Sequence, residues 1–544
     1  MATPLTATAL DALFAALRQI VGADHLLSDH ATLAAYARST AARPTLPCAV
    51  VRPGSHQEVV ALMQAARQFK IPVYPLSTGK NWGYGDACAV QAGQLIVELA
   101  RMRRIVHVDP ELAYAVIEPG VTQQQLADHL HAQGYPLWMD CTGAGPDTSL
   151  MGNILERGFG HSPYGNRLAH VSGMQIVLAD GTVLHTGFGH YPNARTTHLF
   201  PYGVGPFIDG LFTQSNLGIV TQIGLWLMPK SEALNHFLCQ VAQHEDIGPV
   251  VDALRPLRLD GTLRSILHIG NDLRVLSGGQ VFPREAAGGA SCLPDALRQQ
   301  LRARAGGAAW VVSGALYGSR AQVAAARAAV RKALAPTAAK PRFLDERKLR
   351  VGSWLARVLG NSASGQRLQA QVALGSALFA MNRGMPNGRF LAGAYWRRRG
   401  GLPPAFPQRA NPAQDNCGLL WVSPILPMRG AEMLALHALV APLFQQYGFD
   451  LFVTFSMINE RTLGGVITIA FDQDDPAEVA RAQACYQALF DCVMRAGYIP
   501  YRVGNQSMAQ LDPHGDVYWQ TVARIKQALD PDMLIAPGRY QPGA

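Results

Sequence analysis

Pro75-Leu-Ser-Thr-Gly-Lys-Asn-Trp-Gly-Tyr-Gly85 is the most informative segment of this chain. It follows the apolar run Ile71-Pro-Val-Tyr74, so the pattern predicts a strand that runs directly into a glycine-rich turn. Glycine adopts positive φ angles without steric cost, and its backbone N–H can approach an anion closely. The turn matches neither the P-loop nor the G-x-G-x-x-G motif. Two interpretations are therefore open here, a pyrophosphate cradle and a tight surface turn.

Length and composition are typical of a soluble globular protein with several domains. The chain has 544 residues, of which 49% are hydrophobic and 16% charged, and this size predicts two or three domains. No apolar run is long enough to span a membrane, which takes about 18 residues, so we expect no membrane association. The segment Ala9–Val21 has the pattern of an amphipathic helix rather than a signal peptide. We therefore expect a cytoplasmic location.

Cysteine spacing and charge exclude several classes of protein. None of the eight cysteines forms a C-x-x-C pair, so neither a zinc site nor a disulfide framework is predicted, and no metal is expected. The net charge is +9, but the basic residues are spread out except at Arg397–Arg399. A nucleic-acid binder would concentrate them with aromatic residues on one surface. We therefore expect no nucleic-acid partner, and we interpret the arginine triplet as a solvated loop.

The pattern of elements changes near residue 236. Before it, short β-rich runs alternate with helices, and Ser55 and Glu58 have the spacing of a capping box at the start of a helix that ends at Phe69. A hairpin turn is predicted at Asp180-Gly181. Residues 236–500 contain strand-plus-helix blocks, which predict an antiparallel sheet backed by helices. The fold class expected from the sequence is α+β.

Four sequence blocks occur in order and are spread over nearly the whole chain. They are Gly79-Lys-Asn-Trp-Gly-Tyr-Gly85, Gly152-Asn-Ile-Leu-Glu-Arg-Gly-Phe-Gly-His-Ser-Pro-Tyr-Gly165, the stretch from His198 through Asp209-Gly-Leu-Phe-Thr-Gln-Ser-Asn-Leu-Gly-Ile-Val220, and Gly497-Tyr-Ile-Pro-Tyr-Arg502 ahead of Ile535-Ala-Pro-Gly-Arg-Tyr540. Together these blocks resemble the vanillyl-alcohol oxidase family of flavoproteins, and within that family they are most similar to the para-alkylphenol branch, which includes 4-cresol dehydrogenase. Each block alone is a weak signal, but the set at this spacing is highly specific.

The resemblance implies the two-domain FAD-linked oxidase fold. A discontinuous FAD-binding α+β domain would comprise residues 1–235 and 505–544. A substrate-binding cap domain with an antiparallel sheet would comprise residues 236–504. The change of pattern near residue 236 agrees with this division. We also expect a homodimer.

The resemblance further implies oxidation of para-substituted phenols, such as 4-alkylphenols and eugenol-like or vanillyl-alcohol-like compounds, in aromatic catabolism. Hydride would pass to flavin N5 through a p-quinone methide, followed by water addition or desaturation, with O2 or a cytochrome accepting the electrons. Tyr84, Tyr501 and Arg502 match the family positions that place two donors and a cation around the phenolate oxygen. These three residues are the main catalytic candidates.

Asp147 is a fourth catalytic candidate. Oxidases of this group place a carboxylate near flavin N5, a few residues before the Gly-Asn pair of the second block. In this chain the matching position holds Gly145, and Asp147 lies two residues later. A charge there could tune the redox potential, whereas the alternative is an aspartate that only forms a turn.

The cofactor-binding residues are also carried over from the resemblance. Gly152 and Gly158 would let the backbone approach the cofactor closely. Ile219 and Val220 would contact the adenine or ribose, although core packing alone would also explain them. The full predicted set is Ser77, Thr78, Gly79, Lys80, Asn81, Gly83, Gly85, Ser149, Gly152, Asn153, Arg157, Gly158, Tyr164, Gly165, Ile219, Val220 and Arg539.

The chain departs from the family in the residues that would tether the flavin. No histidine occurs from Phe343 to Leu436, and no tyrosine occurs in the segment Cys417–Trp421. We therefore expect dissociable FAD rather than a covalently attached flavin. Beyond the last predicted strand pair, Glu460 could serve as a base for water addition, or it could pair with a neighbouring arginine.

Two alternative functions remain open from the sequence. An FAD-dependent 2-hydroxyacid oxidase or dehydrogenase of the same superfamily would bind a carboxylate with cations and would not need two converging tyrosines. A nucleotide-binding protein without redox chemistry would be colourless when purified. A flavin absorption spectrum would exclude the nucleotide-binding protein. It would not distinguish the 2-hydroxyacid enzyme from a phenol oxidase.

Overall fold

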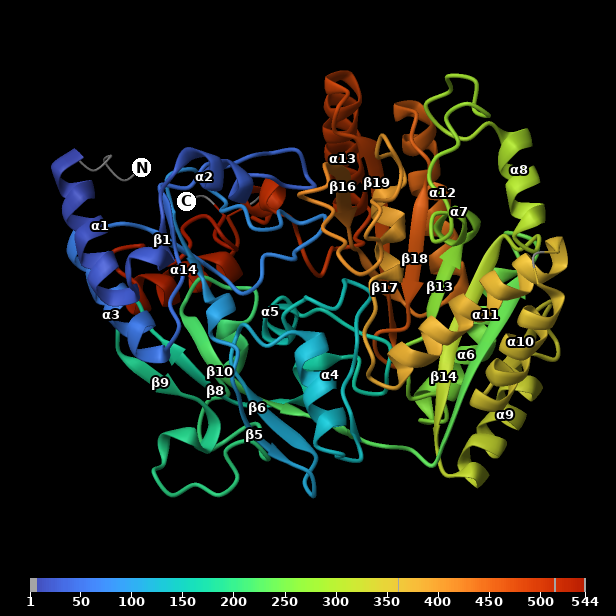
Figure 1. Cartoon of the computed structure of the whole chain (residues 1–544), viewed down its shortest axis with the longest axis horizontal. Coiled ribbons are helices and arrows are strands. Elements are labelled where there is room, and N and C mark those ends of the chain that lie inside the picture. Colours follow the sequence, from blue (N-terminus) through green and yellow to red (C-terminus); the bar gives the residue numbers. More distant parts are fainter. Residues whose placement is uncertain (1–6, 361, 513–514, 543–544) are drawn as a thin grey trace.

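The computed structural model describes residues 7–360, 362–512 and 515–542. Figure 1 shows two lobes side by side. One lobe contains the first part of the chain together with the last helix, α14 (Val517–Leu529), and the other contains the segments coloured yellow to orange. Helices and antiparallel sheets occur in both lobes, and this confirms the predicted α+β class.

The first lobe contains two main sheets. The first sheet has the order β1-β2-β4-β3, in which β2, β4 and β3 are parallel. The second is antiparallel and has the order β5-β6-β10-β8-β9; its last pair, β8 and β9, is the predicted hairpin. The bounds are α1 (Ala7–Val21), β1 (Leu26–Leu27), α2 (His30–Tyr36), β2 (Ala49–Val51), α3 (His56–Phe69), β3 (Val73–Leu76), β4 (Leu95–Glu98), β5 (Ile105–Asp109), β6 (Tyr114–Ile117), α4 (Gln123–Ala132), β7 (Leu137–Trp138), α5 (Leu150–Leu155), β8 (Val171–Val177), β9 (Val183–His185), β10 (Ile219–Trp226) and β11 (Met228–Pro229).

The start of α3 shows how local sequence sets an element boundary. The Ser55 hydroxyl accepts a hydrogen bond from the Glu58 backbone N–H at 3.2 Å, as the capping box predicts. The Glu58 carboxylate accepts from the N–H of Gly54 at 2.8 Å, one residue earlier than the motif requires. Both bonds satisfy N–H groups at the entrance to the helix.

The second lobe is built on one antiparallel sheet. Its order is β15-β12-β14-β13-β18-β19-β16, and β17 also pairs with β19. The bounds are β12 (Ala233–Val241), α6 (Ile247–Leu259), β13 (His268–Asn271), α7 (Asp272–Leu276), α8 (Asp295–Arg304), β14 (Trp310–Gly318), α9 (Arg320–Leu334), β15 (Lys340–Leu344), α10 (Glu346–Leu359), α11 (Ala363–Asn382), the 3-10 helix η6 (Arg389–Tyr395), β16 (Cys417–Val422), β17 (Ile425–Pro427), α12 (Gly430–Tyr447), β18 (Phe452–Ser456), β19 (Thr462–Asp472), α13 (Pro476–Arg495) and the 3-10 helix η7 (Asn505–Gln510).

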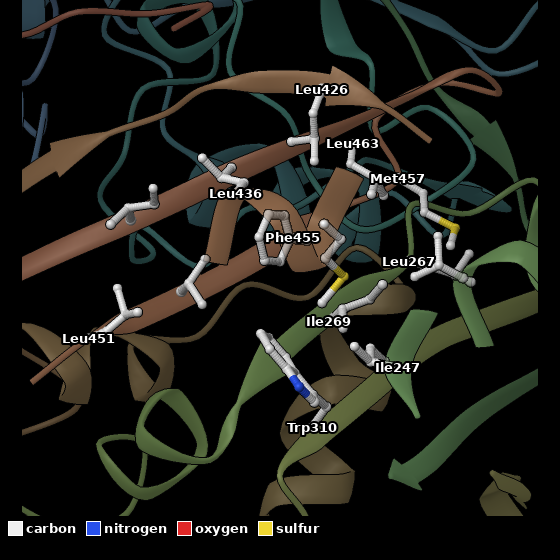
Figure 2. Close-up of a cluster of buried hydrophobic side chains, with 14 of the residues drawn as sticks. Ile247, Leu267, Ile269, Trp310, Leu426, Leu436, Leu451, Phe455, Met457 and Leu463 are labelled. Atoms are coloured by element: carbon white, nitrogen blue, oxygen red, sulfur yellow. The ribbon is translucent and has the colours of Figure 1, made fainter. Parts of the chain in front are cut away.

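Helices α6, α9, α12 and α13 pack against this sheet or against one another. Figure 2 shows the core of this lobe, in which Trp310 and Phe455 lie among aliphatic side chains. Their ring centroids are 6.1 Å apart, and Ile247, Ile269 and Phe455 have no exposed surface. This burial holds the strands that carry the site in fixed register.

A C-terminal segment returns to the first lobe. The N–H of Val73 donates to the carbonyl of Leu534, and the N–H of Ala536 donates to the carbonyl of Val73, both at 2.7 Å. Ile535 thereby extends the parallel sheet beside β3. This pairing supports a discontinuous FAD-binding domain, and we propose boundaries near residues 235 and 505 on this basis.

The prediction that Arg397–Arg399 forms a solvated loop is wrong for Arg397, whereas the Arg399 side chain is 55% exposed. Arg397 is buried and forms an ion pair with Glu478 at 2.8 Å. Arg399 pairs with buried Asp472, and Arg398 donates to two backbone carbonyls. The acidic partners are more than 70 residues away in the chain, so local composition did not reveal them.

Two further predictions concern the cysteines and the membrane. All eight cysteines are free thiols. Within the part of the chain that the structure describes, no helix combines the length and apolarity needed to cross a bilayer.

Candidate active site

The glycine-rich turn after β3 has the backbone conformation that its sequence predicts. Gly79, Gly83 and Gly85 have φ angles of 65°, 74° and 124°, which other residues rarely adopt. Tyr84 donates from its backbone N–H to the carbonyl of Asn81 at 3.1 Å. The turn therefore presents the Tyr84 side chain in one fixed direction.

Tyr84 is buried at the meeting point of both lobes. Its hydroxyl shares a short hydrogen bond with the Ser423 hydroxyl. Its ring meets the Trp421 ring edge-on, with ring centroids 5.5 Å apart. The Arg502 guanidinium lies 4.5 Å from the ring centroid. Burial raises the pKa of Tyr84 although Arg502 opposes it. The phenol therefore stays protonated and can donate a hydrogen bond.

Ser423 connects the two tyrosines that the sequence predicts to act together. Its hydroxyl bonds to Tyr84, and its backbone carbonyl accepts from the N–H of Tyr501 at 3.1 Å. Gln214 donates to the carbonyl of Tyr501 at 2.9 Å and fixes the same peptide. Burial, and then the neighbouring Tyr84, raises the pKa of Tyr501. Sequence reasoning missed Ser423, because a serine after an apolar strand carries no distinctive signal.

Arg502 is held by a carboxylate that sequence reasoning also missed. Its side chain is 10% exposed, and its Nε lies 3.3 Å from Glu156. Glu156 also forms an ion pair with Arg539 and accepts from the Tyr540 hydroxyl at 2.9 Å. Arg502 additionally donates to the side-chain oxygen of Asn81. The C-terminal segment, the second block and the glycine-rich turn therefore meet at one ionic cluster.

The electrostatics of this cluster favour an anion beside it. Burial opposes the ionisation of Glu156, but Arg539 and Arg502 outweigh this effect and hold its pKa below the ordinary value. One carboxylate thus faces two guanidinium groups, and the cluster has one excess positive charge. The position of Glu156 inside the Gly152–Gly165 block, beside Arg157, was the only signal for it in the sequence.

The two predicted cofactor-binding stretches lie against each other. Ser149 caps α5 by accepting from the N–H of Gly152 at 2.9 Å, and its own N–H donates to the Thr78 hydroxyl at 3.2 Å. A Cβ on Gly152 would lie 3.0 Å from the Ser77 hydroxyl. The small residues at these positions allow this close approach.

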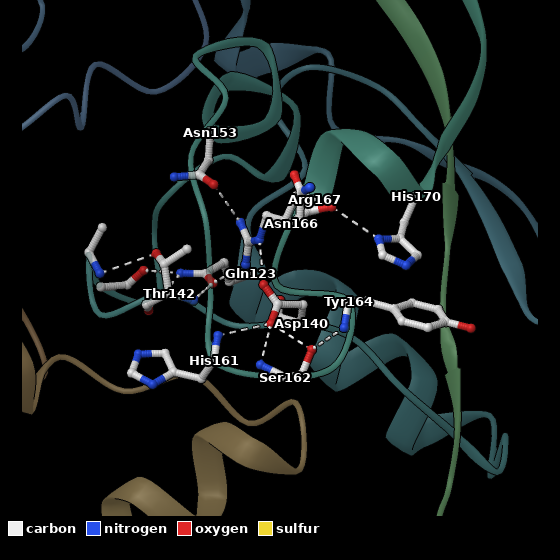
Figure 3. Close-up of polar contacts among 12 residues, drawn as sticks. Gln123, Asp140, Thr142, Asn153, His161, Ser162, Tyr164, Asn166, Arg167 and His170 are labelled. Atoms are coloured by element: carbon white, nitrogen blue, oxygen red, sulfur yellow. Dashed lines mark hydrogen bonds and ion pairs between the residues drawn. The ribbon is translucent and has the colours of Figure 1, made fainter. Parts of the chain in front are cut away.

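A buried ionic network holds the second stretch in place, and Figure 3 shows it. Arg167 donates to the Asp140 carboxylate at 2.7 Å and to the Asn153 side chain at 3.0 Å. Asp140 also accepts from the backbone N–H groups of His161 and Ser162. The network fixes the turn that precedes Tyr164 and Gly165. The sequence analysis did not identify Asp140 or Arg167.

Asp147 lies apart from the tyrosines. It is exposed and lines a small pocket together with Lys80 and Trp82. Among the described residues it forms no hydrogen bond or ion pair with Tyr84, Tyr501 or Arg502. Its assignment as a catalytic residue stays a prediction.

The remaining predicted residues are dispersed around these stretches. Arg157 is exposed and donates to Thr213, and Tyr164 stacks on His170 with ring centroids 4.0 Å apart. Their assignment to the cofactor stays a prediction, as does that of Ile219, Val220, Gly158 and Gly165, which are buried or tightly packed. Glu460 lies 4.0 Å from Arg461, and this contact agrees with the salt-bridge alternative.

The residues of the glycine-rich turn fit an anionic cofactor such as FAD. A Cβ on Gly83 would lie 2.8 Å from the Trp421 ring, so the turn can lie close to this wall only with glycine. Lys80 is half-buried and forms no ion pair among the described residues, and burial lowers its pKa. Its amine and the excess charge near Arg539 are suited to a pyrophosphate.

Gly85→Ala is expected to destabilise the protein and reduce its flavin content, whereas Gly93→Ala has a smaller effect. Both glycines have positive φ angles, so both substitutions strain the backbone by about 1–3 kcal/mol. Only at Gly85 would the new Cβ lie 2.5 Å from a side chain, that of Asn505, which is fixed by its bond to Cys88. Thermal unfolding and the flavin-to-protein absorbance ratio measure the difference. Equal losses in both variants would contradict the proposed close packing of this turn.

The chain is similar in sequence and in structure to several known proteins. A family described as "FAD binding domain" matches residues 47–187. The chain is 38% identical to 1'-carboxy-chondrochloren decarboxylase of Chondromyces crocatus, over 98% of this chain and 97% of that protein. It is 31% identical to the 4-cresol dehydrogenase [hydroxylating] flavoprotein subunit of Pseudomonas putida, over 91% of this chain and 87% of that protein. The structure of p-cresol methylhydroxylase with substrate bound superimposes with a TM-score of 0.87 and 29% identity, covering 99% of this chain and 98% of that one.

Proposed function

Because the chain belongs to the vanillyl-alcohol oxidase and 4-cresol dehydrogenase family of FAD-dependent oxidoreductases, we propose that it oxidises para-substituted phenols at the benzylic carbon. Candidate substrates are 4-alkylphenols and eugenol-like or vanillyl-alcohol-like phenols. The single observation that carries the proposal is the convergence of Tyr84, Tyr501 and Arg502, which Ser423 and Glu156 hold together.

The proposed role of this cluster is to bind the substrate as its phenolate. Tyr84 and Tyr501 keep their protons because burial raises the pKa of each, so both can donate to the phenolate oxygen. Arg502 supplies a positive charge that persists at any working pH. If the Ser423 hydroxyl donates to the Tyr84 oxygen, the Tyr84 O–H becomes a stronger donor to the substrate.

Phenolate formation is what makes the benzylic C–H bond reactive. The oxygen lone pair moves into the ring as hydride departs from the benzylic carbon, and a neutral p-quinone methide results. FAD, when bound, supplies the two-electron acceptor for this hydride. The p-quinone methide then either adds water at the benzylic carbon to give an alcohol or loses a proton from the next carbon to give an alkenylphenol. Donors fixed around the oxygen favour the phenolate over the neutral phenol, and so favour the ionisation that precedes hydride departure.

The electron acceptor and the state of the cofactor belong to the same proposal. The Pseudomonas putida relative is named a dehydrogenase, which supports a cytochrome as the electron acceptor, with O2 as the alternative. We expect dissociable FAD, because no histidine occurs from Phe343 to Leu436 and no tyrosine occurs from Cys417 to Trp421. Tyr395 of η6, the tyrosine nearest to that segment, donates its hydroxyl to Asp415 at 2.6 Å. We also expect the protein to be a homodimer in the cytoplasm.

A second candidate reaction comes from the relative in Chondromyces crocatus, which is named a decarboxylase of a carboxylated compound. In that reaction the p-quinone methide would lose CO2 from the side chain, and the electron pair of the broken C–C bond would restore the aromatic phenolate. A substrate with a carboxylate on its para side chain would be required.

Anaerobic mixing with 4-ethylphenol tests the proposal, and we expect the flavin absorbance near 450 nm to bleach. The methyl ether 4-ethylanisole has the same benzylic C–H bonds but cannot form a phenolate, so it should leave the flavin oxidised. Lactate serves as the probe for 2-hydroxyacid oxidation. Bleaching by lactate and not by the phenol would overturn the proposal. Admission of air then distinguishes an oxidase, which reoxidises quickly, from a dehydrogenase.

A further inference from the structure

Arg274 of α7 is partly buried, and among the described residues no acid neutralises it. Its two terminal nitrogens donate to the Ser277 hydroxyl at 3.3 Å and to the carbonyl of Phe390 at 3.5 Å, both long contacts. Among the described residues it forms no ion pair with any aspartate or glutamate. By contrast, Arg167 and Arg397 each have a buried carboxylate partner at 2.7 and 2.8 Å.

An unpaired cation in such a place is costly. Burying a charge without a counter-ion costs several kcal/mol even after relaxation, and the donors of a guanidinium need acceptors. Burial lowers the pKa of Arg274, and no nearby carboxylate opposes this effect. Arg258, which also lacks an acid, differs because it donates to three backbone carbonyls. Arg274 has the properties expected of a residue whose counter-ion is a ligand.

Two histidines lie in the same region as Arg274. The rings of His161 and His268 are 4.2 Å apart, and His161 also lies against Phe390, the residue whose carbonyl contacts Arg274. Burial, and then the neighbouring His161, holds the pKa of His268 well below its ordinary value, and Arg274 adds to this effect. Burial lowers the pKa of His161 to about 3. Both rings are therefore neutral at physiological pH, and each can donate one N–H.

The orientation of the histidines leaves their rings available. The His161 backbone N–H donates to Asp140, but Figure 3 shows its imidazole pointing away from that network. His268 bonds through Nδ1 to the Ser456 hydroxyl at 2.9 Å. Its Nε2 lies near the backbone of Gly160 without completing a hydrogen bond.

A line of ring contacts joins this cationic group to the tyrosine cluster. His268 stacks on Phe159 with centroids 6.3 Å apart, and Phe159 lies 6.0 Å from Tyr501. Neighbouring rings therefore lead from the proposed phenolate end, past Phe159, to the two histidines near Arg274. The two ends are chemically different, because one offers phenolic donors and the other an uncompensated guanidinium.

We propose that Arg274, with His161 and His268, binds a carboxylate on the para side chain of the phenol substrate. The inference rests on the proposed function and specifies its substrate class as phenols with an acidic side chain. The carboxylate would give Arg274 its missing counter-ion through two parallel N–H···O bonds. The imidazole N–H groups would donate to the same oxygens, and the aromatic ring would lie along Phe159.

Two ligands that cannot react isolate this binding step. In 4-tert-butylphenol and 2-(4-hydroxyphenyl)-2-methylpropanoate the benzylic carbon carries no hydrogen, so neither can transfer hydride. They differ by the replacement of one methyl group with a carboxylate. Titration calorimetry on the FAD-loaded protein measures the Kd of each. We expect the carboxylate to bind about 10- to 100-fold more tightly, as charge-assisted hydrogen bonds predict.

Arg274→Gln is expected to remove this preference and leave the Kd of 4-tert-butylphenol within about twofold. Arg274→Lys should retain part of it, because the charge remains. An equal loss of affinity for both ligands, or no change for either, would overturn the inference. Loss of FAD from the Gln variant would also overturn it, because Arg274 would then serve the cofactor. Thermal unfolding of each variant identifies one that fails to fold, and His161→Phe then provides the same ligand comparison.

Failure of the inference differs from failure of the proposed function. If wild-type protein binds 4-tert-butylphenol and is reduced by 4-ethylphenol, but gains nothing from the carboxylate, only the Arg274 site is wrong. If no phenol binds or reduces the flavin, the phenol chemistry itself is wrong.

Discussion

Replacing Arg502 with alanine is expected to slow reduction of the flavin by 4-ethylphenol by about 10²–10³-fold while FAD remains bound. The guanidinium is a permanent positive charge beside Tyr84, so its loss raises the free energy of the phenolate and of the transition state that follows from it. Glu156 keeps a partner in Arg539, so the variant should fold. Anaerobic stopped-flow absorbance gives the limiting rate and the apparent Kd separately.

Two companion variants sharpen this result. Arg502→Lys keeps the charge but not the fork of donors, so its rate should fall between those of wild type and the alanine variant. Tyr84→Phe removes one neutral donor that also bonds to Ser423 and should cost less than the loss of the cation. Unchanged reduction in Arg502→Ala would exclude this residue from the mechanism.

Glu156→Gln is expected to lower the free energy of unfolding by about 3–5 kcal/mol, because it leaves two guanidinium groups without their shared counter-ion. The Glu156 side chain is 13% exposed and contacts both Arg502 and Arg539. Chemical denaturation at pH 7 measures the loss. Glu460→Gln is the matched control, because the Glu460 side chain is half exposed and its contact with Arg461 is long, at 4.0 Å. Its effect should stay within about 0.5 kcal/mol.

The pH dependence of the free energy of unfolding, compared between wild type and Glu156→Gln, is an independent check on this ion pair. The folded-state pKa of Glu156 is depressed, so its stabilisation is fully present above the unfolded-state pKa of about 4.3. It is lost as the pH falls through the folded-state value, because the carboxylate must then take up a proton. The stability difference between wild type and Glu156→Gln should therefore be constant above about pH 5 and narrow below about pH 4. A constant difference down to acidic pH would contradict an ionised Glu156.

Local patterns predicted the elements better than the site. The cap at Ser55 and the hairpin at Asp180-Gly181 depend on neighbouring residues, and both are confirmed. The meeting of Tyr84 with Arg502 spans more than 400 residues, so only the family resemblance could suggest it. Ser423 and Glu156 are ordinary residues in ordinary contexts, and only the folded chain reveals their partners. The buried ion pair of Arg397 with Glu478 was not predicted for the same reason.

The pairing of Ile535 with Val73 sets an order for the biosynthesis of the protein. The strand β3 is made early, but the segment that covers its edge is translated only after the whole second lobe. At typical translation speeds this interval lasts roughly 20–90 s. During that time β3 has an unpaired edge, which can pair with strands of other chains. Arg539, on the same late segment, completes the ionic cluster beside Tyr84, so this cluster is incomplete in a nascent chain until residues 535–540 emerge from the ribosome.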